Sequence, residues 1–115
     1  MATHGAAANF VVTEDFITQK PKVVTAILAA LRDAEAFIQK PENFSEALMI
    51  AKTFFRFDID RGDDIMAAQL KRSIPSYKAG LSRSALRQIA DNMLTSKLLE
   101  APFDTTNMIY DKALE

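Results

Sequence analysis

The apolar residues between Pro21 and Pro41 recur at the spacing of one helix face, and this repeat constrains the fold more than any other feature. Most lie three or four positions apart: Val24, Ile27, Leu28, Leu31, Ala34 and Ile38. Proline is tolerated in the first turn of a helix, and the residue before a proline avoids the helical conformation. We therefore predict one helix that begins at Pro21 and ends just before Pro41.

Two more helices are expected in the middle of the chain. Asn43 and Glu46 form a start signal related to the capping box, and the helix after them should end at the break 58–62. The next helix should begin near residue 60, with Asp60 as a possible cap, and reach about Arg72. The residues expected in the core of the earlier of these helices are Ala47, Leu48, Ile50, Ala51, Phe54 and Phe55.

The C-terminal third of the chain predicts a loop, a helix and a short terminal helix. The loop covers 73–82, which contains a proline and a glycine. Either Ser82 or Ser84 should cap the following helix, which is expected to run to about Leu99. The last, short helix is expected from Thr105 or Thr106 to Tyr110.

Residues 9–17 have a different composition, because Phe10, Val11, Val12 and Thr13 are all strand formers. A single strand cannot satisfy its own backbone groups, and nothing later in the chain offers it a partner. The predicted fold class is therefore mainly α with one N-terminal β-strand. Residues 1–8 are expected to be a flexible lead-in, and 9–115 the structured segment.

The composition excludes several kinds of chemistry. The net charge of −1 argues against a nucleic-acid partner, and the lack of cysteine excludes disulfides and thiolate metal sites. His4 is the single histidine and stands alone in the lead-in, so we expect no catalytic residue, no metal ligand and no cofactor. The chain has no apolar run of ~20 residues, so membrane insertion is not expected. The N-terminal residues do not resemble a signal peptide, so a complete product would be cytoplasmic.

Four aspartates, Asp58, Asp60, Asp63 and Asp64, raise the possibility of a calcium loop. The spacing fails, because Gly62 comes one place too early and Gln69 stands where a bidentate glutamate belongs. Negative charge in the first turn of a helix opposes the helix dipole. We therefore interpret these aspartates as the start of a helix.

A basic patch, defined as Lys71, Arg72, Lys78, Arg83 and Arg87, lies in a stretch without acidic residues. The connection between its two predicted helices is too long for a helix-turn-helix motif. An anion-facing surface remains open, but solvated helix faces with acidic partners elsewhere are the favoured interpretation. The aromatic cluster Phe54, Phe55 and Phe57 is interpreted as core rather than as a cofactor pocket.

Three segments follow one another in an order known from one protein family: 10–17, then 21–24, then the alanine-rich 29–38. This order resembles the C-terminal part of ABC-transporter substrate-binding proteins of the nitrate/sulfonate/bicarbonate and thiamine-pyrimidine-precursor group. Residues 41–47 and 98–102 are similar to the next helix of that family and to its ending.

The resemblance implies the C-terminal segment of a two-lobed α/β periplasmic-binding-protein (type II) fold, with the predicted strand at the hinge. Such a protein, located in the periplasm, would deliver a small anionic or heterocyclic solute to an ABC permease without catalysis. Asn9, Phe10 and Tyr77 would then be the residues nearest the ligand. This chain lacks the second lobe and the main sheet of the first, from which most ligand contacts come. Expressed alone, it is expected to form homo-oligomers that cover the strand edge.

A second hypothesis needs no resemblance. In it the chain is a free-standing helical protein-interaction or regulatory module that binds through the basic patch 71–87. Salt sensitivity of partner binding would favour this hypothesis, and thermal stabilisation by a small sulfonate or pyrimidine would favour solute binding.

Overall fold

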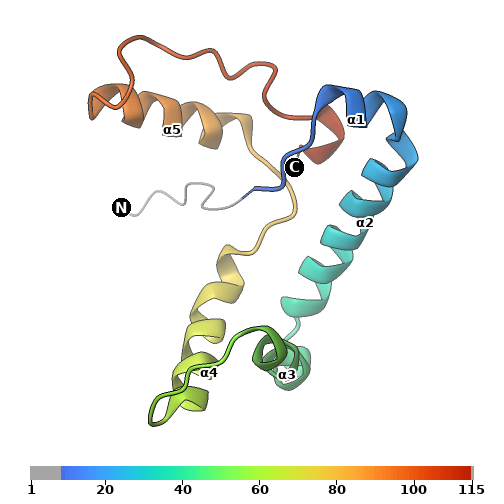
Figure 1. The fold of residues 1–115 in the computed structure, drawn as a ribbon, viewed down its shortest axis with the longest axis vertical. Helices are drawn as coiled ribbons and strands as arrows, with labels where there is room; N and C mark the ends of the chain where they lie inside the picture. Colours follow the sequence, from blue (N-terminus) through green and yellow to red (C-terminus); the bar gives the residue numbers. More distant parts are fainter. Residues whose placement is uncertain (1–8, 115) are drawn as a thin grey trace. The chain divides into compact units, whose positions relative to one another are not determined.

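The structure is a computed structural model that describes residues 9–114, and within that range every regular element is helical (Figure 1). The elements follow in the order α1 (Glu14–Gln19), α2 (Pro21–Ile38), η1 (Pro41–Asn43), α3 (Phe44–Phe54), α4 (Gly62–Ser73), η2 (Ile74–Ser76), α5 (Arg83–Thr95) and η3 (Asp111–Ala113). The extended pairing found among the described residues is one isolated parallel bridge between Leu81 and Leu114. The protein is therefore all-α.

The predicted N-terminal β-strand is wrong. Residues 9–13 are irregular, and Thr13 is the N-cap of α1, with its hydroxyl accepting a hydrogen bond from Phe16 N at 3.1 Å. Glu14 and Asp15 occupy the first turn of this helix, where negative charge is favourable. A strand at 10–13 would have had no second strand to pair with. The capping signal at Thr13 therefore determined the local structure, and the β propensity did not. The predicted lead-in 1–8 lies outside the described residues.

The helix between the two prolines is confirmed, since α2 begins at Pro21 and ends at Ile38. Its apolar face is less buried than predicted. Val24 is buried, whereas Ile27 keeps 40% of its surface exposed. This helix crosses the boundary between two compact units, 1–29 with 79–115 (unit 1) and 30–78 (unit 2), which are described separately below.

Unit 2 is built on the contact between α3 and α4. Its buried hydrophobic residues are Ala47 from α3 and Met66 and Leu70 from α4. The helix start predicted at Asn43 is confirmed, since Asn43 is the N-cap residue of α3, but the capping hydrogen bond expected there is not made. The Asn43 amide Nδ2 donates instead to the carbonyl of Phe37 at 2.8 Å.

The start of α4 also differs from the prediction. Arg61, not Asp60, is the N-cap, in the left-handed conformation at φ 57°. Asp63 and Asp64 do lie in the first turn, as predicted. The next residue after the cap is Gly62, which is buried and packs closely against the connection from α3.

Three side-chain contacts join the C-terminal part of α2 and the residue after its end to the segment after α4 within unit 2. The Gln39 Nε2 amide donates to the carbonyls of Ile74 at 2.9 Å and Tyr77 at 3.2 Å. Lys78 Nζ lies 3.3 Å from Glu35 Oε1. The predicted loop at 73–82 is thereby held in place, and it contains the short helix η2.

Unit 1 contains α5 and the C-terminal segment. The predicted cap Ser82 is confirmed, since its hydroxyl accepts from Ala85 N at 3.3 Å. The helix ends at Thr95 rather than near Leu99, because Lys97 adopts a left-handed conformation at φ 58°. The short helix predicted at 105–110 is wrong, and η3 follows instead at Asp111–Ala113.

The buried hydrophobic residues of unit 1 come from α2, α5 and the C-terminal segment: Val24, Ala90, Ile109 and Ala113. The C-terminal segment is fixed to the start of α5 by a backbone bond from Leu81 N to the Ala113 carbonyl at 2.9 Å. Arg83 adds a second connection, donating to the Thr106 carbonyl at 2.6 Å.

Candidate functional site

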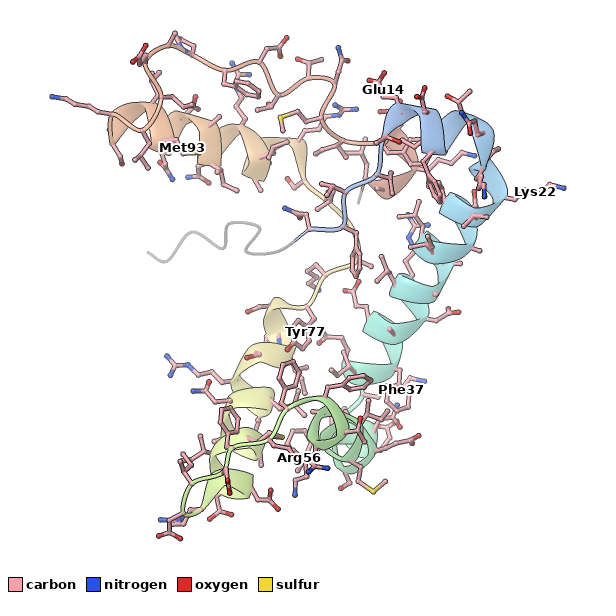
Figure 2. The ribbon with its side chains drawn as sticks, in the orientation of Figure 1. Glu14, Lys22, Phe37, Arg56, Tyr77 and Met93 are labelled. Atoms are coloured by element: carbon pink, nitrogen blue, oxygen red, sulfur yellow. The ribbon has the colours of Figure 1, made fainter. Side chains whose placement is uncertain are left out.

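The residues predicted to lie near a solute do not come together within either unit. Asn9 and Phe10 belong to unit 1, where Phe10 keeps 79% of its surface exposed. Tyr77 belongs to unit 2, directly after η2 (Figure 2), and keeps 45% of its surface exposed. Ligand binding by these three residues stays a prediction.

The basic patch 71–87 is divided between the two units and is opposed by acidic groups. Lys78 pairs with Glu35, and Arg83 Nη2 lies 2.5 Å from Asp111 Oδ1. The remaining members of unit 2, Lys71 and Arg72, are exposed in the last turn of α4, where positive charge is favourable. Neither unit therefore presents all five basic side chains as one surface.

Asp104 is held by a polar turn in unit 1. Its Oδ1 accepts from Thr106 N at 2.9 Å and from Thr106 Oγ1 at 2.6 Å. These hydrogen bonds to the ionised form lower the pKa of Asp104 below its ordinary value of 3.8, and the nearby charge of Arg87 adds to the effect. The arrangement orders a surface turn, and it gives Arg87, the last residue of the basic patch, an acidic neighbour.

Two of the four aspartates considered for a calcium loop, Asp63 and Asp64, have structural partners. Asp63 Oδ2 lies 2.6 Å from Lys52 Nζ, and Asp64 Oδ2 lies 3.1 Å from Arg61 Nε. Within the described part of the chain, no three histidine, cysteine or acidic side chains are grouped closely enough to hold a metal ion. His4 lies outside that part.

Unit 2 carries an exposed apolar stretch, called here the 49–59 surface, which is formed by the end of α3 and the connection to α4. Its large hydrophobic residues are exposed by 47–78% of their area, and they are Met49, Ile50, Phe54, Phe55, Phe57 and Ile59. The prediction that Ile50, Phe54 and Phe55 belong to the core is therefore wrong. On the same helix, Ala47 is buried and Leu48 is half-buried. These inward-facing side chains are smaller or fewer than the exposed hydrophobic ones.

One signal in the sequence could have identified part of this surface. Residues 55–60 alternate strictly between apolar and charged side chains: Phe55, Arg56, Phe57, Asp58, Ile59, Asp60. A period of two does not fit a buried helical face and indicates an extended segment with one apolar side. The connection is indeed non-helical at 55–58.

Comparison with protein-family models, curated proteins and solved structures finds no significant match to this chain. None of the helices in the described range is both long enough and apolar enough to cross a membrane. The chemistry of the 49–59 surface therefore has to be judged from its own residues.

Proposed function

We propose that this chain is a helical protein-interaction module that binds a partner protein through the 49–59 surface and performs no catalysis. One observation carries the proposal: six large hydrophobic residues within a single short stretch of unit 2 are exposed together. Large contiguous apolar patches on a folded surface mark interaction sites. Scattered single hydrophobic residues would carry no such meaning.

The composition of the surface favours a protein as partner. Phenylalanine and methionine are enriched at protein interfaces, and Phe54, Phe55 and Met49 are each more than 60% exposed. Covering apolar area releases about 25 cal/mol per Å² of surface removed from water. The charged residues that lie between or beside them, Lys52, Arg56 and Asp58, provide the polar rim of such an interface.

The two hypotheses raised by the sequence now have unequal support. Solute delivery depended on a strand at 9–13, and that segment is irregular. Binding through the basic patch 71–87 depended on unopposed positive charge, and Lys78, Arg83 and Arg87 have acidic neighbours. We therefore keep the second hypothesis, a protein-interaction module, but place its binding surface at the apolar 49–59 surface instead of the basic patch 71–87. The compartment, periplasmic by resemblance or cytoplasmic, stays a prediction.

Site-specific photo-crosslinking in cells tests the proposal. Benzoylphenylalanine is placed at Phe54 in the 49–59 surface or, as a matched control, at Leu98 in unit 1, which is 71% exposed. We expect a discrete cross-linked species from position 54, weakened by Phe57→Ser, and none from position 98. Equal, diffuse labelling from both positions, or no adduct from position 54, would contradict the proposal.

A further inference from the structure

The connection between α3 and α4 contains an unpaired stretch of backbone (Figure 1). Phe55 N still donates to the Ala51 carbonyl of α3, and the Ile59 carbonyl accepts from Gly62 N at 3.0 Å. Between these two bonds, the backbone groups of Arg56 and Asp58 take part in none of the hydrogen bonds found among residues 9–114. Exposed backbone of this kind can accept another chain as a strand partner.

Gly62 shows which side of this stretch is open. A Cβ built on Gly62 would lie 2.3 Å from the Phe57 carbonyl oxygen, so that oxygen faces the start of α4. In an extended chain, the N–H and C=O of consecutive residues point to opposite sides. Phe55 at the start of the stretch is extended (φ −120°, ψ 128°), and we infer that 56–58 continue in this way. The backbone groups of Arg56 and Asp58 would then point away from α4, toward solvent.

In the inferred extended conformation, successive side chains of the stretch alternate between two faces. Phe55, Phe57 and Ile59 share the apolar face, and each is exposed by 47–65% of its area. The same alternation assigns Arg56, labelled in Figure 2, and Asp58 to the other face, and neither makes an ion pair within the described part of the chain. One end of this charged face is positive and the other negative.

We infer that the occupant of this edge is a second copy of the chain, paired antiparallel about a two-fold axis at Phe57. This inference rests on the proposed function and names its partner. The antiparallel arrangement places Arg56 of each copy opposite Asp58 of the other, so the two-fold axis forms the favourable pair twice. It also places Phe57 against its own equivalent and Phe55 against Ile59, all on one apolar face.

The direction of the backbone groups fixes the hydrogen-bonding register. Because Phe57 turns its carbonyl toward Gly62, the pair at the axis is the non-hydrogen-bonded kind, whose side chains approach most closely. Arg56 and Asp58 then exchange the backbone bonds between the copies. A parallel pairing would set Arg56 beside Arg56 and would lose both ion pairs.

Charge reversal in the full chain tests this pairing by sedimentation equilibrium. Arg56→Asp and Asp58→Arg each convert both cross-strand pairs to like charges, and each should weaken self-association about tenfold or more. An equimolar mixture of the two variants restores opposite charges at both positions, so it should associate about as tightly as the wild type. Arg72→Glu, on an exposed arginine of α4, changes net charge as much as Arg56→Asp and should have no effect.

Amide hydrogen exchange gives an independent check of the register. On association, the N–H groups of Arg56 and Asp58 should gain protection, whereas that of Phe57 should not. A monomeric wild type at all concentrations, or a mixture that associates no better than either variant, would overturn the pairing. If the pairing fails in this way but the crosslink from position 54 joins a different protein, the proposed function is supported and only the second copy as partner is rejected. If no crosslink forms, the proposed function is contradicted, whereas sedimentation and hydrogen exchange, which do not use the crosslink, still decide the pairing.

Discussion

Replacing Gly62 with alanine should destabilise unit 2, although alanine is the better helix former. Gly62 is the first residue of α4 and is buried against the connection from α3. The new Cβ would stand 2.3 Å from the Phe57 carbonyl oxygen and 3.0 Å from Phe57 Cβ. Both contacts are to atoms near the backbone, so the strain cannot be relieved by rotating the end of a flexible side chain.

The magnitude follows from two opposing terms. The backbone at Phe57 must move by about 1 Å to restore an ordinary contact of 3.4 Å or more, and inserting a group into a packed position typically costs ~1–3 kcal/mol. Removing the conformational freedom of glycine returns about 0.5–1 kcal/mol. The expected net loss in the free energy of unfolding is about 1–2 kcal/mol, or a drop in melting temperature of several degrees.

Urea denaturation followed by circular dichroism at one fixed protein concentration measures this loss. The fixed concentration matters because self-association would add its own stabilisation. Ala68→Gly, at an exposed position of the same helix, is the matched control, and it should cost about 0.5–1 kcal/mol from propensity alone. An alanine at position 62 that leaves the midpoint unchanged or raises it would contradict the argument that Phe57 leaves no room for a Cβ at this position.

Three further outcomes concern unit 1. Ser82→Ala should cost about 1 kcal/mol in urea denaturation, since it removes the hydroxyl that caps α5, whereas Ser84→Ala should cost clearly less. Arg83→Met should speed amide exchange in 106–114 while costing at most about 1 kcal/mol, because its ion pair with Asp111 is exposed; unchanged exchange would contradict this. Thr106→Val should raise the pKa of Asp104, measured by NMR titration, because it removes the hydroxyl that lowers it most. The lowered pKa means that the stabilisation from this turn is present above the unfolded value and is lost as the pH falls through the folded value. A pKa unchanged by the substitution would assign the shift to the backbone bond or to Arg87.

Helix positions were predictable where the signal was local. The two prolines fixed α2, because proline restricts the backbone whatever surrounds it. Ser82 fixed the start of α5, because a capping hydroxyl needs only the next three residues. The start of α4 could not be predicted in the same way. Its cap Arg61 is left-handed and makes no side-chain bond, and the adjacent Gly62 depends on a contact with Phe57.

Burial was predicted less well than helix position, for a physical reason. Hydrophobic periodicity says which face of a helix is apolar but not whether another element covers that face. Along α3, Ala47 is buried as predicted, while Ile50 and Phe54 are exposed by 49% and 78%. The candidate surface was therefore missed by the assumption that aromatic residues at helical spacing belong to the core.

The two segments with a strand-like composition differ in what they can specify. The segment 10–12 is apolar on both faces, and its residues Phe10, Val11 and Val12 are exposed by 48–89%. Shifting its pairing with another strand by one residue would change little, so no single register is favoured. Residues 55–60 instead alternate apolar and charged side chains, so a slip of one residue would exchange the faces. A slip of two would separate Arg56 from Asp58 of a second copy. β propensity alone did not make a strand at 10–13, because a strand needs an edge to pair with. The segment 55–59 carries its own complement in reverse order, so in the proposed pairing a second identical chain would supply both the edge and the register.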